Sequence, residues 1–312
     1  MIAFAVIIAV IGAQNVAIAR FFPHLARMTT DFSPAYLDRE LRNLAGGPRK
    51  TIFFGDSVVW GFDLPSDQAA VSMLASQGCA CVNLAFKGGS PANDFALVRL
   101  LERYSVRPKL LVLQINQKVL SPTDDAYKNL NLTLSAVAGS YFSARDRALL
   151  QVPENPMPAA RRSMDRALAS VWTMYAMRAD LRETFFGDTD ESLPQRRAVA
   201  SDFLGAYDLS ALTSANVGIH FLEKTLAALQ RDHIPVLAVM TPTNHALLHD
   251  STDTPEYRAN GIYLQKLLTR YGARVADFDR AIPTNEFFDN DHMTVAGQRR
   301  FASMLKGWLP QT

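Results

Sequence analysis

The sequence predicts an α/β fold with a central, mostly parallel sheet that helices cover on both faces. Five short apolar runs are expected to form strands, near residues 51–54, 79–85, 109–115, 234–240 and 273–278. Helical patterns near 67–77 and 92–104 separate the first three runs. Continuous apolar runs that alternate with helices are typical of parallel strands buried on both faces. The chain has 312 residues and is 48% hydrophobic, which suffices for one sizeable α/β core.

The chain opens with an apolar segment. From Ile2 to Ala19 only Gln14 and Asn15 interrupt the run. A helix of about 20 residues, rising ~1.5 Å per residue, just spans the ~30 Å hydrocarbon core of a bilayer. We therefore expect residues 1–22 to be a transmembrane anchor that holds the domain outside the cytoplasm, in the periplasm or extracellular space. A cleaved signal peptide and a buried core helix are the alternatives.

A connecting segment, residues 23–47, is expected to follow the anchor. Ser33 and Pro34 predict a helix start, because serine is favoured as the N-cap and proline at the first helical position. The helix is expected to run to about Asn43, and the main domain to span residues 48–312.

A long insertion follows the third predicted strand. No strand pattern is found over about residues 121–215, whereas helical spacing occurs at 145–186 and 195–207. A segment of this length is too long for a simple loop and is expected to lie beside the site. Its several arginines are expected to form a solvated face, or else to meet anionic glycan or lipid head groups.

The first candidate catalytic residue is Ser57, in the sequence Gly55-Asp56-Ser57 after the first apolar run. A serine on a turn past a strand end can expose its hydroxyl above the sheet, where a nucleophile reaches a carbonyl. Position 59 is valine, so this is not the Gly-x-Ser-x-Gly elbow. A plain turn is the alternative interpretation.

The second candidate lies near the end of the chain, where Asp289 precedes His292 by three residues. If this segment forms one tight turn, the carboxylate can orient the imidazole, which then takes the proton of Ser57. Asp291→Asn is expected to have little effect. The alternative is that Asp289 or Asp291 only caps the helix that follows.

Two further candidates follow the second and third apolar runs. Gly88 lies in a glycine turn, where a backbone N–H can approach a bound oxygen, and Asn116 supplies a side-chain amide. Ligands bind at the carboxyl ends of parallel strands. All four candidate pieces are expected to meet there.

These four pieces resemble the blocks of the SGNH (GDSL-type) hydrolase superfamily, over roughly residues 50–120 and 233–308. The resemblance implies an SGNH-type three-layer sandwich with a Ser-His-Asp triad. In that triad Ser57 is the nucleophile, His292 the base and Asp289 its orienting acid. The resemblance also implies an oxyanion hole formed by the N–H groups of Ser57 and Gly88 and the side chain of Asn116.

The chain departs from the family pattern in its third block, which reads Gln114-Ile115-Asn116-Gln117 instead of Gly-x-Asn-Asp. Ala85 replaces a common glycine, and Gly89 competes with Gly88 as the donor. These variations resemble the membrane-tethered, envelope-modifying branch, which includes proteins of alginate O-acetylation and teichoic acid D-alanylation.

That branch implies acyl transfer to or from a cell-envelope polysaccharide, with acetyl as the expected acyl group. A multi-spanning membrane acyltransferase is the partner that the resemblance implies. The alternatives are a stand-alone esterase or lipase-like hydrolase and an accessory module of a membrane O-acyltransferase.

Asn244 and His245 follow the fourth predicted strand and are expected to line the substrate pocket. No cofactor or metal is expected, because His245 and His249 lack an evident third ligand. The net charge of +2, without a basic stripe, argues against nucleic-acid binding.

The two cysteines, Cys79 and Cys81, are one residue apart. This spacing predicts neither a relaxed disulfide nor a zinc site. We expect both to be small apolar residues on the buried second strand.

Overall fold

The chain divides into two compact units in its computed structural model. The first contains residues 1–43 and 154–196, and the second contains residues 44–153 and 197–312. The structure describes residues 2–21, 34–62, 64–120, 130–150, 164, 167–168, 171–176, 207 and 209–310. The sheet and all the candidate catalytic residues lie in the second unit.

Five parallel strands form one sheet in the order β2-β1-β3-β4-β5. The strands are β1 (Thr51–Phe54), β2 (Cys81–Asn83), β3 (Leu110–Ile115), β4 (Val236–Met240) and β5 (Arg274–Asp277). Ile52 of β1 is in register with Val82 on one side and Leu111 on the other. The predicted α/β class and the five predicted strand positions are therefore confirmed, although β2 is shorter than expected.

Burial along the strands follows their place in the sheet. Every residue of β1, β3 and β4 is buried, whereas the edge strand β5 exposes Arg274 and Asp277. This contrast agrees with apolar sequences in the centre and charged residues at an edge.

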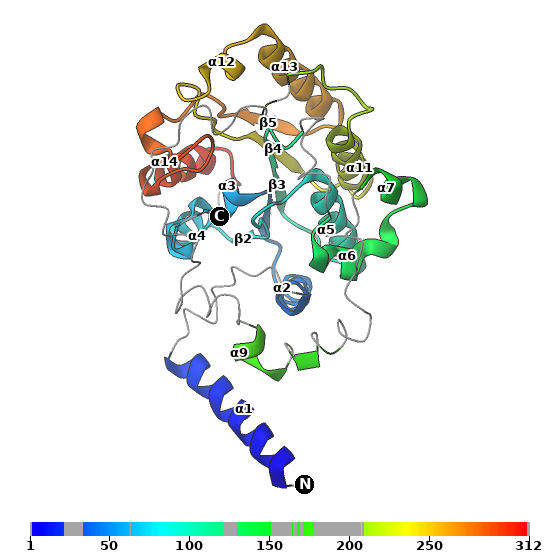
Figure 1. The fold of residues 1–312 in the computed structure, drawn as a ribbon, viewed down its shortest axis with the longest axis vertical. Coiled ribbons are helices and arrows are strands. Elements are labelled where there is room, and N and C mark those ends of the chain that lie inside the picture. Colours follow the sequence, from blue (N-terminus) through cyan, green and yellow to red (C-terminus); the bar gives the residue numbers. More distant parts are fainter. Residues whose placement is uncertain are drawn as a thin grey trace. The chain divides into compact units, whose positions relative to one another are not determined.

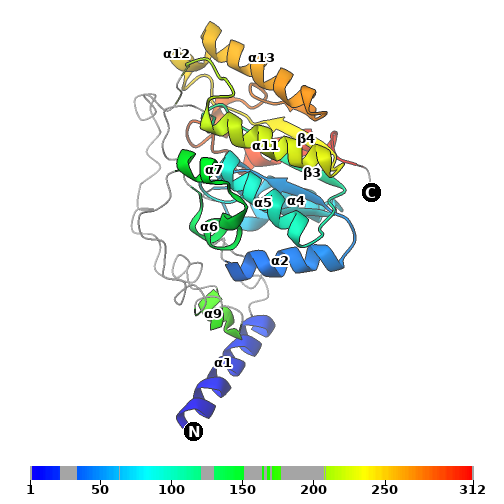
Figure 2. The same cartoon turned by 90° about the vertical axis from the view of Figure 1, so that its right-hand side faces the viewer.

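Helices cover both faces of this sheet. The helices α4 (Ala70–Ser76) and α14 (Val295–Lys306) lie on one face, and α5 (Pro91–Arg103) and α11 (Val217–Arg231) lie on the other (Figure 1). The helix α13 (Pro255–Arg270) packs beside β5, and Figure 2 shows it with α5 and α11 in front of the strands. Both α5 and α13 begin with a capping hydroxyl, from Ser90 or Thr254, followed by proline.

The strand order places a topological switch point between β1 and β3. From β1 the chain crosses to β2 on one side, and it then returns past β1 to β3, β4 and β5 on the other. In open parallel sheets, the crevice at the carboxyl ends of the two switch-point strands is where ligands bind. The turn after β1 and the residue after β3 carry Ser57 and Asn116, so the fold brings both to this crevice.

The described part of the predicted insertion is helical. It contains α6 (Leu132–Ala138), the 3-10 turn η4 (Gly139–Tyr141) and α7 (Ala144–Leu149). Of these, α6 and η4 pack against α5, and the rings of Phe95, Phe142 and Phe221 cluster between the elements. Most of the helical patterns predicted over 145–186 and 195–207, including their arginines, lies outside the described residues.

The apolar N-terminal run forms a helix, α1 (Ile2–Phe21), in the first unit. Its two side-chain amides, Gln14 and Asn15, bond with residues next to the short helix α9 (Thr173–Ala176). The Trp172 indole N–H donates to Gln14 Oε1 (2.8 Å), and Asn15 Nδ2 donates to the Val171 carbonyl (2.8 Å). Contrary to the anchor expected over 1–22, no helix among the described residues is long and apolar enough to cross a membrane.

The connecting helix α2 (Pro34–Gly46) begins at the proline that predicted it and ends three residues beyond the expected Asn43. Ser33, its predicted cap, lies outside the described residues.

The expectation for the cysteines was wrong, because Cys79 and Cys81 form a disulfide. The Cys81 N–H donates to the Cys79 carbonyl (2.8 Å), which closes a three-residue turn. The turn brings the two Cα atoms to 5.2 Å, within the usual range for a disulfide. Only Cys81 belongs to β2, and both side chains are half-buried against the core.

One buried carboxylate joins α7 to α11. Asp146 is 1% exposed and accepts hydrogen bonds from Ser143, His220 and Lys224. Burial alone raises the pKa of a carboxyl, but these hydrogen bonds outweigh burial and hold the pKa of Asp146 below its usual value. The carboxylate therefore stabilises the fold above the unfolded-state pKa of about 3.9, and the contribution is lost as the pH falls.

We expect Asp146→Ala to lower the free energy of unfolding by about 3 kcal/mol at pH 7, because it leaves Lys224 half-buried without its partner. Urea denaturation measures this change. The difference from wild type should shrink as the pH falls below about 4. Asp250→Ala is the control, because the Asp250 side chain is 89% exposed. Equal losses in the two variants would contradict the assignment.

Candidate active site

Ser57 is the first residue of a one-turn helix, α3 (Ser57–Trp60), directly after β1. Asp56 caps this helix, because its Oδ1 accepts from the Val58 N–H (2.8 Å). Gly61 ends the helix with a φ of +94°, a left-handed conformation that favours glycine. A Cβ on Gly61 would also lie 2.6 Å from that of Ala69. Both ends of the short helix that begins with Ser57 are therefore fixed.

The structure brings Ser57, His292 and Asp289 into one hydrogen-bonded chain. Ser57 Oγ lies 2.8 Å from His292 Nε2, and His292 Nδ1 lies 2.7 Å from Asp289 Oδ2. Asp289 Oδ1 also accepts from the backbone N–H groups of Asp291 (3.1 Å) and His292 (2.8 Å). The segment is therefore the single tight turn that the spacing predicted, and it provides the geometry of a nucleophile, a base and an orienting acid.

The charges around the imidazole favour its protonated form. Burial lowers the pKa of His292, but the hydrogen bond to Asp289 and the negative charges of Asp291, Asp289 and Asp56 outweigh it and leave the pKa raised. Burial raises the pKa of Asp289, and the bonds from His292 outweigh this and leave it lowered. The pair is arranged to stabilise an imidazolium ion, which is the form that arises when Ser57 gives up its proton.

Asn244 supports the turn that carries the triad acid. Its Nδ2 donates to the Asp289 carbonyl (2.9 Å), and its backbone N–H donates to the Asn290 carbonyl (2.8 Å). Its Oδ1 accepts from the Leu247 N–H, and the residue is only 5% exposed. These bonds make Asn244 a support for the loop. They do not test its expected place in the substrate pocket, which stays a prediction.

His245 is also bound to neighbouring residues. Its Nε2 lies 2.9 Å from Asp279 Oδ2, and the Tyr257 hydroxyl donates to Asp279 Oδ1 (2.8 Å). The ring also meets Tyr257 edge to face. These side-chain bonds place His245 in a cluster with Asp279 and Tyr257. They do not test its expected place in the substrate pocket, which stays a prediction.

The two neighbouring glycines after β2 have different environments. The Gly89 N–H donates to the Phe86 carbonyl (3.0 Å), and a Cβ on Gly89 would lie 2.3 Å from the Gly55 carbonyl oxygen. Gly88 has a φ of +75°, open space around it and no hydrogen-bond partner for its N–H among the described residues. Of the two, Gly88 is the one whose N–H is available to a bound oxygen.

Gln114 joins the nucleophile turn to β3. Its Oε1 accepts from the Asp56 N–H (2.9 Å), and its Nε2 donates to Asp56 Oδ1 (2.7 Å). A Cβ on Gly55 would lie 2.3 Å from Gln114 Oε1, so only glycine fits there. In the sequence, Gln114 stands out only as a departure from the pattern of the family that the chain resembles, and that departure was the signal for this role.

A small cavity of about 20 Å³ lies behind the turn, with room for about one water molecule. Asp56, Asp94, Gln114 and Asn116 are among the residues that line it. Burial, followed by the charge of Asp291, raises the pKa of Asp56 to about 6. Burial, followed by the charge of Asp56, raises the pKa of Asp94 well above its usual value. Nothing in the sequence pattern marked Asp94 as part of this region.

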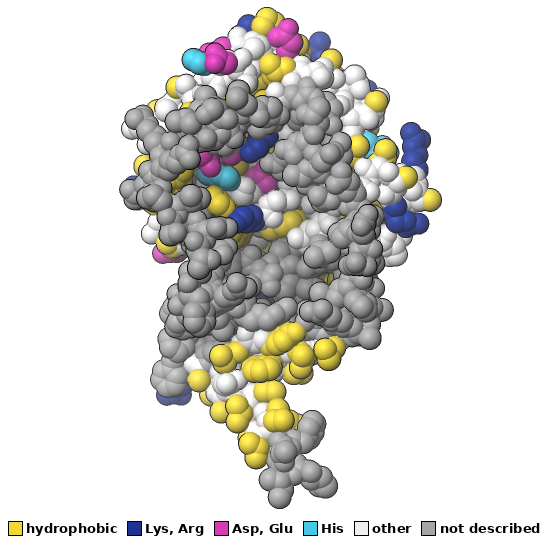
Figure 3. All heavy atoms as spheres, viewed as in Figure 1, with side chains coloured by type: hydrophobic (Ala, Val, Ile, Leu, Met, Phe, Trp, Pro, Cys, Tyr) yellow, Lys and Arg dark blue, Asp and Glu magenta, His cyan; other side chains and the backbone are white. Residues whose placement is uncertain are grey.

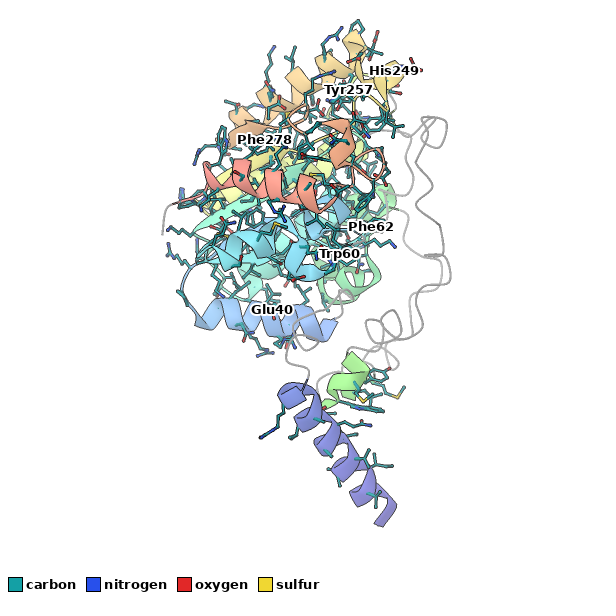
Figure 4. All side chains as sticks on the ribbon, turned by 90° about the vertical axis from the view of Figure 1, so that its left-hand side faces the viewer. Glu40, Trp60, Phe62, His249, Tyr257 and Phe278 are labelled. Atoms are coloured by element: carbon teal, nitrogen blue, oxygen red, sulfur yellow. A yellow bond between two sulfur atoms is a disulfide. The ribbon has the colours of Figure 1, made fainter. Side chains whose placement is uncertain are left out.

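Phe62, just past α3, covers one side of the imidazole. The ring centroids of Phe62 and His292 are 4.4 Å apart, and Lys87 Nζ lies 4.9 Å from the Phe62 centroid. Trp60 and Phe62 lie next to each other at this end of α3 (Figure 4). Figure 3 shows acidic, basic and histidine side chains together in a hollow on one face. No pattern in the sequence marked Phe62 as part of this site.

Among the described residues, Asp289, Asp291 and His292 are the only group with three ligand atoms close enough to hold a metal ion. The imidazole Nδ1 and the Asp289 carboxylate already bond to each other, so an ion would compete with the triad. Proton transfer is the chemistry that the arrangement supports.

Comparisons with known proteins give a limited result. A protein-family model matches residues 210–312, less than half of the chain. No curated protein matches the chain.

Several solved structures match at low similarity. A lipolytic protein of the G-D-S-L family from Veillonella parvula is 13% identical, with 83% of this chain and 97% of that chain covered and a TM-score of 0.41. A putative acylhydrolase from Bacteroides fragilis is 11% identical, with 89% of this chain and 96% of that chain covered and a TM-score of 0.44. A catalytic mutant of an acetylxylan esterase from Geobacillus stearothermophilus is 10% identical, with 86% of this chain and 99% of that chain covered and a TM-score of 0.42. With values this low, function has to be argued from the site itself.

We expect the His292 pKa to lie above its ordinary value of about 6.5, and Asp289→Asn to lower it by removing a negative partner. An NMR titration of the ring measures both values, with His292→Ala used to assign the signal. Phosphonate labelling of Ser57 should speed up as the pH rises through the same midpoint, because the base must be neutral. A midpoint below 6.5 in the wild type would contradict the predicted direction.

Proposed function

We propose that the protein is a serine-dependent enzyme that acts on carboxylic esters through an acyl-Ser57 intermediate, in the manner of the SGNH (GDSL-type) hydrolases. The observation that carries this proposal is the hydrogen-bonded chain from Ser57 to His292 to Asp289, located at the carboxyl end of β1. Asn116 and Gly88 follow neighbouring strands and supply amide donors of the kind that an oxyanion hole requires.

In the first half of the proposed reaction, His292 Nε2 takes the Ser57 hydroxyl proton while Oγ attacks the ester carbonyl carbon. The carbonyl oxygen becomes an anion, which the N–H groups of Ser57 and Gly88 and the Asn116 side chain stabilise. Asp289 stabilises the imidazolium. His292 then gives the proton to the departing alkoxide, so an alcohol leaves and Ser57 carries the acyl group.

In the second half, an acceptor hydroxyl loses its proton to His292 and attacks the carbonyl carbon of the acyl-serine. The bond from that carbon to Ser57 Oγ then breaks, and His292 returns the proton to Oγ, which restores the free serine. Water as acceptor gives hydrolysis, and a sugar hydroxyl gives transfer. Both outcomes use the same residues, so the triad alone supports either.

For the acceptor we propose a cell-envelope polysaccharide, with acetyl as the transferred group. The support is the set of block variations at Ala85, Gly89 and Gln114, which resemble the envelope-modifying branch. Location outside the cytoplasm and pairing with a multi-spanning acyltransferase belong to the same proposal and rest on the same resemblance. A purely accessory role is less favoured, because such a role does not require an assembled triad.

Ser57→Ala should abolish both labelling by a serine-directed phosphonate and release of p-nitrophenol from its acetate ester. The expected loss in rate is ~10⁴ or more, because the nucleophile is absent. The matched control is Ser76→Ala, since Ser76 is an exposed serine on α4. If Ser57→Ala is labelled as strongly as wild type, the assignment of the nucleophile is wrong.

Asn116→Ala should lower kcat by roughly 10²–10³ with little change in KM, because the charge that the amide stabilises develops only in the transition state. Steady-state kinetics with the same ester give both constants. A loss confined to KM would make Asn116 a substrate-binding residue instead.

The products separate transfer from hydrolysis. The wild-type protein is given an acetyl ester donor with and without envelope oligosaccharide, and acetylated sugar and free acetate are measured by mass spectrometry. Transfer predicts acetylated sugar at the expense of acetate. Acetate as the sole product with every sugar offered would favour the esterase alternative.

A further inference from the structure

Asp291 is a buried carboxylate that the proposed reaction does not use. It is 3% exposed, and its Oδ2 accepts a hydrogen bond from Asn116 Nδ2 at 3.0 Å. The triad acid is Asp289, since His292 Nδ1 lies 2.7 Å from Asp289 and 3.7 Å from Asp291. Asp291 therefore contacts the amide of a proposed oxyanion donor while belonging to the turn that carries the base.

Both ends of the Asn116 side chain are fixed. Its Oδ1 accepts from the Lys118 backbone N–H (3.0 Å), and its Nδ2 donates one hydrogen to Asp291. The side-chain amide has two N–H groups, so one remains for a ligand. The two bonds define the plane of the amide and hence the direction of this second N–H.

Keeping a carboxylate in this place costs free energy. Asp291 Oδ1 is buried and has no hydrogen-bond partner among the described residues, and the ammonium group of Lys118 is no closer than 3.9 Å to Oδ2. Buried carboxylates are normally satisfied at both oxygens. The negative charge also lies near the place where an oxyanion would form. A role that offsets these costs is expected, and orienting Asn116 provides one.

We propose that Asp291 is a positioning residue that holds the Asn116 amide in the orientation required to stabilise the oxyanion. The inference rests on the proposed function, because it assigns the donor role of Asn116 to that reaction. Its physical basis is that an oxyanion donor is effective only when it already points at the oxygen on which charge develops. A freely rotating amide would have to be ordered during the reaction.

Orientation by a hydrogen-bond acceptor predicts different results for two substitutions. Asp291→Ala removes the acceptor and should lower kcat about tenfold or more, with KM unchanged. Asp291→Asn keeps the volume and one acceptor oxygen, and should stay within about twofold of wild type. If Asp291→Asn is as damaging as Asp291→Ala, the charge matters and the positioning proposal fails.

A double-mutant cycle tests whether Asp291 acts through Asn116. In an Asn116→Ala background, adding Asp291→Ala should change kcat by less than about twofold, because the group to be oriented is gone. The rates are compared at a pH well above the His292 midpoint, where an effect on the base alone would vanish. The same factor of loss in both backgrounds would overturn the proposal and indicate action through His292 or through the fold.

An NMR measurement tests the proposal without reference to activity. The Asn116 side-chain amide proton that bonds to residue 291, assigned by its absence in Asn116→Ala, should exchange slowly with solvent in the wild type and in Asp291→Asn. It should exchange rapidly in Asp291→Ala. Slow exchange in Asp291→Ala would overturn the positioning role even if the protein is an esterase. Conversely, the predicted exchange pattern without esterase activity would contradict only the proposed function.

Discussion

The two hydrogen bonds between the Gln114 carboxamide and Asp56 fix the nucleophile turn to the strand that carries Asn116. They cross the switch point between β1 and β3, where a parallel sheet opens a crevice. A second glutamine, Gln298, joins the helix that follows His292 to the nucleophile turn. Gln298 on α14 accepts from the Ala70 N–H (2.9 Å) and donates to the Val58 carbonyl (3.0 Å), and so ties the helix after His292 to α3.

Four carboxyl groups lie in or next to the site, and each has different partners. Asp289 is paired with His292, and Asp56 is held by Gln114 and the Val58 N–H. Burial and repulsion from Asp56 raise the pKa of Asp94 well above its usual value. Asp291 bonds to Asn116. The negative charges of Asp289, Asp291 and Asp56 raise the pKa of His292 and favour its imidazolium form.

Sequence reasoning located the strands and the four motif pieces because both follow from local rules. A strand buried on both faces must be apolar along its length, which is true of Ile52–Phe54 and Val236–Met240. Ligands of a parallel sheet bind at the carboxyl ends of its strands, and Ser57, Gly88 and Asn116 all follow such ends. The tight turn from Asp289 to His292 is likewise a local feature.

The rest depended on contacts between distant segments, which one sequence does not display. Asn244 looks available after β4, but it bonds the loop 45 residues further along the chain. In the sequence Gln114 only replaces a glycine of the family pattern, whereas in the structure its side chain bonds to Asp56. The pairing of Cys79 with Cys81 required a three-residue turn that shortens their separation, and propensity does not reveal such a turn. Asp94 became notable only through its burial beside Asp56.

The hydrogen bond from Ser57 to His292 joins residues 235 positions apart, and this separation has a consequence for biosynthesis. The ribosome makes Ser57 long before it makes His292. A nascent chain that ends before Asp289 lacks both the base and the orienting acid of the proposed reaction. Under the proposed function, Ser57 can be activated only after β5 and the Asp289–His292 turn have been synthesised.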